Sequence, residues 1–127
     1  MPISYRIDSD LGVVLTTATG ALTDDELLAH KKKLARDPAF TPGMAELADM
    51  RGVERIDVTA EGVRTLIAQD QAAGVQGSLR LAIVASQDEL FGMARMYQML
   101  GEDGFVRVHV CRDADDARAW LGLPREA

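Results

Sequence analysis

The residues of this sequence that could do chemistry are a cysteine with a histidine beside it, several acidic pairs and a hydroxyl at an expected helix start. Cys111 stands two residues after His109, and on a strand this spacing places both side chains on one face. A thiolate–imidazole pair can act as a nucleophile, but it needs an orienting third group and an oxyanion hole. The sequence indicates neither, so we interpret Cys111 as a partly buried strand cysteine and expect no catalytic residue.

Acidic pairs occur in loops or where helices are expected to begin: Asp24/Asp25, Asp88/Glu89, Glu102/Asp103 and Asp115/Asp116. Carboxylates at a helix start cap backbone N–H groups and complement the helix dipole, which accounts for these pairs without catalysis. His30 and His109 belong to no cluster with the spacing of metal ligands. The sequence contains none of the common nucleotide-binding or hydrolase motifs. We therefore expect no metal and no cofactor.

Composition and charge narrow the class of protein. The chain has 127 residues, of which 47% are hydrophobic and 27% charged, as in one globular domain. A net charge of −6 argues against nucleic-acid binding, and we interpret the one basic run, residues 30–33, as a solvated helix face. One cysteine permits no intrachain disulfide, which fits a reducing compartment. The sequence has no signal-peptide pattern, and no apolar run approaches the length of about 20 residues that a membrane-spanning helix needs. We therefore expect a cytoplasmic protein.

The elements that must position these residues alternate after an opening hairpin. We expect strands around 3–7, 13–19, 44–50, 79–85 and 105–111, and helices around 23–36, 59–73, 86–100 and 113–121. Capping boxes begin the helices at Thr23 and at Ser86. This order predicts an α/β fold with a single mixed sheet of about five strands, an antiparallel first strand and about four helices, all in one domain, 1–127. The first and last strands have one polar face each and should lie at the sheet margins, with 79–85 inside.

The helix 86–100 has more apolar surface than one packing face requires. In LFGMARMYQML, Leu90 to Leu100, the apolar residues cover an arc of about 160°, whereas about 100° suffices. Either the helix is wedged between the sheet and a neighbouring helix, or it presents an apolar strip to a protein partner, a second copy of the chain or a small apolar ligand. The residues of this candidate apolar strip are Leu90, Phe91, Met93, Met96, Tyr97 and Met99.

The stretch LADMRGVERIDVTAEGVRTL, residues 47–66, resembles the strand–loop–helix segment of STAS domains, which include anti-anti-sigma factors of the SpoIIAA type. MPISYRID at the start, FGMARMY at 91–97 and AWLGLP at 119–124 resemble the SpoIIAA-like family of small bacterial proteins, which is grouped with STAS and CRAL-TRIO-like folds. The resemblance covers nearly all of the chain. It implies a non-catalytic regulatory domain that self-associates or binds a protein partner. The alternative implied by the CRAL-TRIO-like grouping is a binder of a small apolar or lipid-like ligand, lined by Met93, Met96 and Tyr97.

The same resemblance implies an interaction loop, which consists of Asp57, Val58, Thr59, Glu61 and Gly62. In the anti-anti-sigma factors this loop carries Asp-Ser, and a partner kinase phosphorylates the serine. Here Asp57 matches the aspartate, Val58 stands at the serine position and Thr59 follows. Thr59 is therefore the candidate phosphoacceptor, and a phosphate would add a charge of about −2. We also expect Thr59 to cap its helix by accepting a hydrogen bond from a backbone N–H near Gly62.

Overall fold

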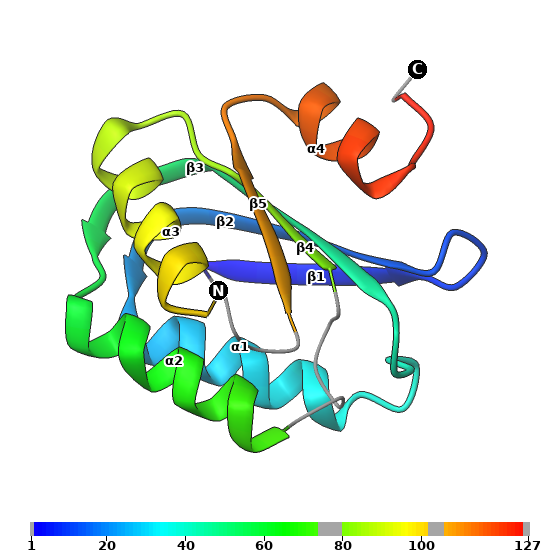
Figure 1. Cartoon of the computed structure of the whole chain (residues 1–127), viewed down its shortest axis with the longest axis horizontal. Coiled ribbons are helices and arrows are strands. Elements are labelled where there is room, and N and C mark those ends of the chain that lie inside the picture. The colour runs from blue at the N-terminus through cyan, green and yellow to red at the C-terminus, as the bar shows by residue number, and fades with distance from the viewer. Residues whose placement is uncertain (1, 74–79, 102–105, 126–127) are drawn as a thin grey trace.

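The computed structural model describes residues 2–73, 80–101 and 106–125, which form one five-stranded sheet and four helices (Figure 1). The strands lie in the order β1-β2-β3-β4-β5. In chain order the elements are β1 (Ile3–Asp8), β2 (Val13–Thr23), α1 (Asp24–Arg36), β3 (Ala45–Asp57), α2 (Ala60–Ala73), β4 (Arg80–Val84), α3 (Asp88–Leu100), β5 (Arg107–Cys111) and α4 (Ala114–Leu121). Among the described residues no helix is long and apolar enough to cross a membrane.

The strand pairing follows from the connections. β1 and β2 are antiparallel because a short turn joins them, with Gly12 at a φ of 68° that a side chain would strain. The later strands are parallel because a helix separates each from the next. β1 and β5 are the sheet edges and β4 lies inside, as predicted. The predicted α/β architecture with a mixed sheet is therefore confirmed.

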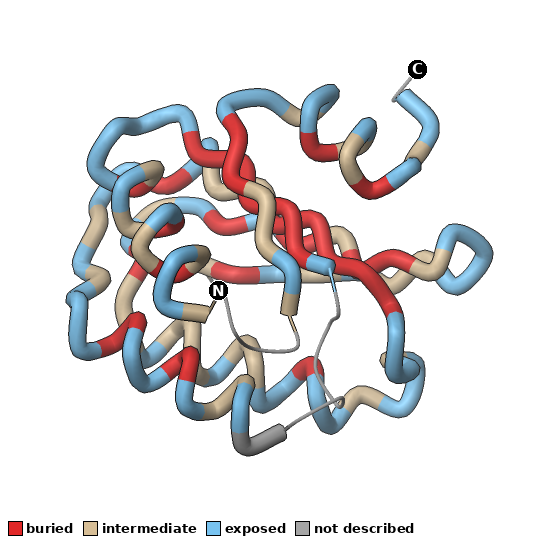
Figure 2. Tube along the Cα trace, in the orientation of Figure 1, coloured by how far each residue is buried: buried red, intermediate tan, exposed pale blue. Residues whose placement is uncertain are grey.

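The helices divide unequally between the two faces of the sheet. We call the face covered by α1, α2 and α3 the three-helix face and the opposite one the α4 face (Figure 1). Alternate residues of β3 point to each: Ala48 packs among the residues of α2 and α3, whereas Ala45 and Leu47 pack with Ala117 and Leu121 of α4. Figure 2 shows the buried residues concentrated along the inner strands.

Two boundaries differ from the sequence prediction. β3 continues to Asp57 instead of ending near residue 50, because β2 is also longer and pairs with it through Thr23, across two irregularities in register. The capping box predicted at Ser86 is wrong: Gln87 is the N-cap of α3 and makes no side-chain cap bond. The N-cap at Thr23 is confirmed, since its hydroxyl accepts a hydrogen bond from the Glu26 N–H at 3.2 Å. The glycines at 74, 77 and 104, the acidic pair at 102–103 and the predicted strand starts at 79 and 105 lie outside the described residues.

Candidate functional site

The junction between β3 and α2 carries the predicted interaction loop. β3 ends at Asp57 and α2 begins at Ala60, with Thr59 between them. The Thr59 hydroxyl oxygen accepts a hydrogen bond from the Gly62 N–H at 3.0 Å, which is the helix cap expected from the sequence. Parallel strands of α/β sheets commonly place functional loops at their carboxyl ends, and this junction lies at such an end.

Asp24, the first residue of α1, completes this junction. Its carboxylate accepts two hydrogen bonds from Thr59, one from the hydroxyl at 2.6 Å and one from the backbone N–H at 2.9 Å. A Cβ on Gly62 would lie 2.0 Å from an oxygen of this carboxylate, so a side chain there would displace it. The sequence assigned Asp24 only to the start of its own helix, because a sequence separation of 35 positions hides its contact with Thr59.

The loop residues divide between exposed and buried positions. Asp57, Thr59 and Glu61 are exposed, and Asp57 forms a surface ion pair with Arg55 at 2.8 Å. Val58, at the serine position of the resemblance, packs inward against the cluster that contains Leu90. Gly62 is buried. A partner would therefore meet the three exposed side chains, while the other two fix the shape of the loop.

The apolar strip of α3 is mostly used inside the molecule. Leu90 and Tyr97 are buried, while the three residues Phe91, Met93 and Met96 are partly buried. The helix contacts both α2 and β5, as expected of a helix wedged between a sheet and a neighbouring helix. The exception is the last turn, where Met99 is 65% exposed beside the exposed Leu100.

A cavity of about 90 Å³ lies between the sheet and the three helices. Leu90, Met93 and Tyr97 of the apolar strip line one side of it. Its polar wall is formed around Glu46 of β3, whose carboxylate accepts a hydrogen bond from the Thr16 hydroxyl at 2.7 Å and lies 2.8 Å from Nε2 of His30. Burial raises the pKa of Glu46, but the His30 and Thr16 contacts outweigh burial, and the net pKa is lowered. Glu46 is therefore a buried carboxylate that its neighbours keep ionised.

The solvated helix face predicted for the basic run 30–33 holds for Lys32 and Lys33, which are exposed, but not for His30 and Lys31. His30 reaches Glu46 inside the molecule, and the Lys31 ammonium donates to Asp70 at 2.6 Å and to the Tyr97 hydroxyl at 2.8 Å. Tyr97 in turn donates to Asp70. Burial lowers the pKa of Lys31, but the neighbouring Tyr97 and Asp70 outweigh it and the pKa is raised. For these two residues the prediction failed because consecutive residues of a helix point in different directions, so that some of them face the protein interior. Only the packing of α1 on the sheet determines which residues these are.

The α4 face is more open and more polar. Between β1 and α4 lies a groove of about 340 Å³. Its charged lining residues are Arg6, Asp49, Arg51 and Arg118. Asp49 and Arg51 pair with each other at 2.8 Å, and Arg51 lowers the pKa of that carboxylate.

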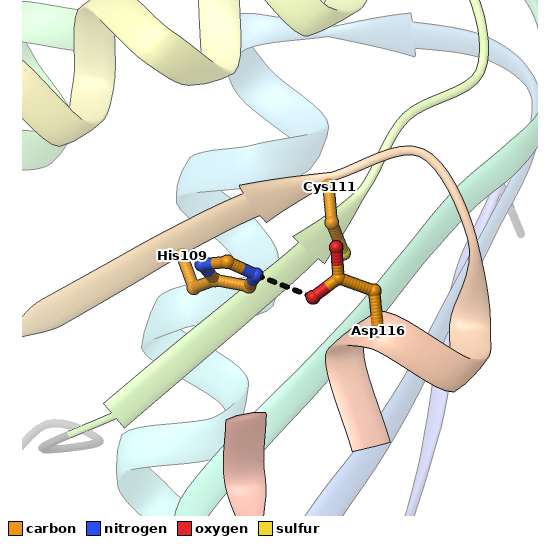
Figure 3. Close-up of side chains that lie close together, drawn as sticks. All are labelled: His109, Cys111 and Asp116. Atoms are coloured by element: carbon orange, nitrogen blue, oxygen red, sulfur yellow. Dashed lines mark hydrogen bonds and ion pairs between the residues drawn. The ribbon is translucent and has the colours of Figure 1, made fainter. Parts of the chain in front are cut away.

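Cys111 and His109 share one face of β5, as the sequence predicted, and Asp116 of α4 joins them (Figure 3). The expectation that His109 belongs to no cluster is therefore wrong. His109 pairs with Asp116 at 2.8 Å, while the Cys111 thiol donates to the backbone oxygens of Ile83 and Asp113. Burial, with the nearby carboxylates of Asp116 and Asp113, raises the pKa of Cys111 to about 11. A thiol held protonated in this way is a poor nucleophile.

The element order and sheet topology define an α/β fold, and two solved structures share this architecture. One is an uncharacterized DUF3478-family protein with a SpoIIAA-like fold from Shewanella loihica PV-4, at a TM-score of 0.57 and 18% identity, over 94% of this chain and 91% of that one. The other is an anti-sigma factor antagonist from Mycobacterium paratuberculosis, at a TM-score of 0.53 and 18% identity, over 94% of each chain. Comparison with protein-family models and with curated proteins gave no match. The SpoIIAA-like fold predicted from the sequence is confirmed.

Proposed function

We propose that this protein is a non-catalytic, SpoIIAA-like regulatory domain that binds a protein partner through the β3–α2 junction and the last turn of α3. The observation that carries the proposal is the organisation of the junction. Gly62 leaves room for the Asp24 carboxylate, which orients the exposed Thr59 hydroxyl at a helix start. The anti-sigma factor antagonist of the same fold supports a protein as the partner.

Thr59 is the proposed point of regulation. A phosphate on its hydroxyl would add a charge of about −2 beside the Asp24 carboxylate and remove the hydrogen bond between them. The starts of α1 and α2 would then repel each other and the loop would change shape. Incubation with host lysate and ATP, followed by phosphopeptide mapping, tests this step, with Thr59→Ala and Thr65→Ala as matched variants. Thr65 is an exposed threonine farther along the same helix. Phosphate at Thr65 alone, or none, would contradict a regulatory role for Thr59.

The last turn of α3 is the proposed apolar part of the interface, for a protein partner or for a second copy. Met99→Glu should abolish capture of a partner, or dimerisation measured by native mass spectrometry. Leu11→Glu is the matched control, because Leu11 is 45% exposed in the β1–β2 turn, at the opposite end of the molecule from the junction (Figure 1). Equal binding by both variants would place the interface elsewhere.

A small apolar ligand is the second candidate, favoured by the cavity on the three-helix face. At about 90 Å³ the cavity is smaller than the roughly 300–1,000 Å³ of usual ligand pockets. It therefore suits only a molecule of a few atoms, and a lipid-sized ligand would require the helices to separate. A small molecule retained in native mass spectrometry would support this candidate, and an unliganded mass would favour the interaction domain.

A further inference from the structure

Three side chains of different chemistry converge where β5 meets α4. His109 offers an imidazole nitrogen, Cys111 a sulfur and Asp116 a carboxylate oxygen, and these atoms all lie within 4.8 Å of one another (Figure 3). The cluster is on the α4 face, whereas the β3–α2 junction leads into helices of the three-helix face. It is therefore a separate feature from the proposed interface.

Local structure brings these residues together. His109 and Cys111 share a face of β5 because they are two residues apart. Asp113 then caps α4 by accepting from the Asp116 N–H at 2.8 Å, and this turn returns Asp116 over the strand. The His109 ring stacks on Trp120 of α4, with centroids 5.1 Å apart and an interplanar angle of 15°. The ring plane is thus fixed independently of the ion pair.

The donor set matches that of a zinc site, and its atoms lie close to the spacing that zinc requires. Zinc accepts thiolate, imidazole and carboxylate ligands, and sites with three protein ligands keep a fourth position for water. Bond lengths of about 2.0–2.3 Å place the ligands of a tetrahedral zinc about 3.3–3.8 Å apart. His109 and Asp116 atoms are now 2.8 Å apart, so admitting an ion requires them to separate slightly while the sulfur approaches.

We propose that His109, Cys111 and Asp116 bind a zinc ion, with water in the fourth position. The solvent side is open, because the side chains of His109 and Asp116 are 30% and 51% exposed. Binding releases the thiol proton to solvent, since the thiolate is the ligand. The thiolate and one carboxylate then neutralise the two positive charges of the ion. Arg112, the adjacent cation, pairs with Asp88 and stacks on Phe91, away from the cluster.

Titration with cobalt(II), a spectroscopic substitute for zinc, tests the proposal on the purified, reduced chain. Cys111 is the only cysteine of the sequence, so a thiolate-to-cobalt charge-transfer band in the near ultraviolet reports on one known sulfur. We expect this band to saturate at one equivalent, to disappear when zinc is added, and to be absent from Cys111→Ser. Zinc should also raise the melting temperature of the wild type.

A matched pair of variants separates a zinc site from general attraction by acidic residues. Asp115 and Asp116 are neighbours in the first turn of α4, but Asp115 lies toward Arg125. Asp116→Asn should weaken cobalt binding by more than about tenfold, since even changes to outer partners of ligands cost about 10–100-fold. Asp115→Asn should leave the affinity unchanged. Because Asp116 is exposed, its variant should fold even if Cys111→Ser does not. No charge-transfer band in the wild type, or an equal loss in both asparagine variants, would overturn the proposal.

Discussion

Two acidic residues of β3 that point to opposite faces of the sheet differ in burial and in the partners of their carboxylates. Glu46 points to the three-helix face, is 7% exposed and has His30 and Thr16 as partners from other elements. Asp49, three residues later in β3, points to the α4 face and pairs at the surface with Arg51 of the same strand. The carboxylate of Glu46 thus depends on partners distant in the sequence, whereas that of Asp49 depends on a neighbour in its own strand.

The same difference applies to the spaces on the two faces. Three helices cover a small, mostly apolar cavity, whereas one short helix leaves a polar groove and the His109–Cys111–Asp116 cluster within reach of solvent. Stability should therefore be most sensitive to changes on the three-helix face, and we expect ions or polar groups to bind on the α4 face.

The largest expected effect tests the two acidic residues directly. Glu46→Ala should lower the free energy of unfolding by about 3–5 kcal/mol, because His30 and Thr16 lose their buried partner. Asp49→Ala should cost about 0–1 kcal/mol, since its ion pair is partly exposed. Urea unfolding measures both. Similar losses in the two variants would mean that burial beneath the helices does not determine how much these carboxylates contribute to the free energy of unfolding.

The pH dependence of stability should sharpen the same contrast. Because the pKa of Glu46 is lowered in the folded state from its ordinary value of 4.5, its contribution is present above about pH 4.5 and is lost as the pH falls below that value. The stability difference between wild type and Glu46→Gln should therefore shrink on acidification. Urea midpoints between about pH 3 and pH 7 check this. A difference that stays constant would show that the folded state does not hold Glu46 ionised.

Two alanines compare the packing of the faces. Ala48 lines the cavity, whereas Ala82 is fully buried on the α4 face, outside the cavity lining. Filling a cavity of about 90 Å³ gains at most about 2 kcal/mol at roughly 24 cal/mol per Å³. Ala48→Val should therefore stabilise the fold by about 1 kcal/mol, while Ala82→Val should destabilise it by about 1–3 kcal/mol through overpacking. Thermal unfolding gives the sign of each change, and two changes of the same sign would contradict the expected difference in packing.

The smallest effect concerns two hydroxyls at the starts of helices on the three-helix face. Thr59→Ala should cost about 1 kcal/mol, because Thr59 caps α2 and holds Asp24. Ser86→Ala should stay within about 0.5 kcal/mol, since Gln87 and not Ser86 is the N-cap of α3. Urea unfolding of the two variants decides the matter. A Ser86 variant as unstable as the Thr59 variant would restore the capping box predicted from the sequence.

Much of the fold could be read from local patterns. Alternation in Ile3–Asp8 predicted an edge strand, and the apolar run before Ser86 predicted an interior strand. This works because the distribution of apolar residues along a strand depends on whether one or both of its faces are buried. Helix boundaries were less secure, as the failed cap at Ser86 demonstrates. β3 was placed too short because its second half is mostly polar and exposed, with Val53 and Ile56 as the apolar exceptions, and pairs only with β2.

The sequence by itself determined the types of side chain available: one thiol, two imidazoles, a threonine before a glycine-containing helix and an excess of acids. It also determined that Cys111 and His109 share a face and that Thr59 caps α2, because such contacts span two or three residues. Only the tertiary structure decided that Asp24 holds Thr59, that His30 and Lys31 point inward, and that Asp116 meets His109. The first two depend on how α1 packs beside its neighbours, and the last on how α4 returns over β5. These contacts depend on how whole helices pack on the sheet, and the local sequence pattern does not predict that packing.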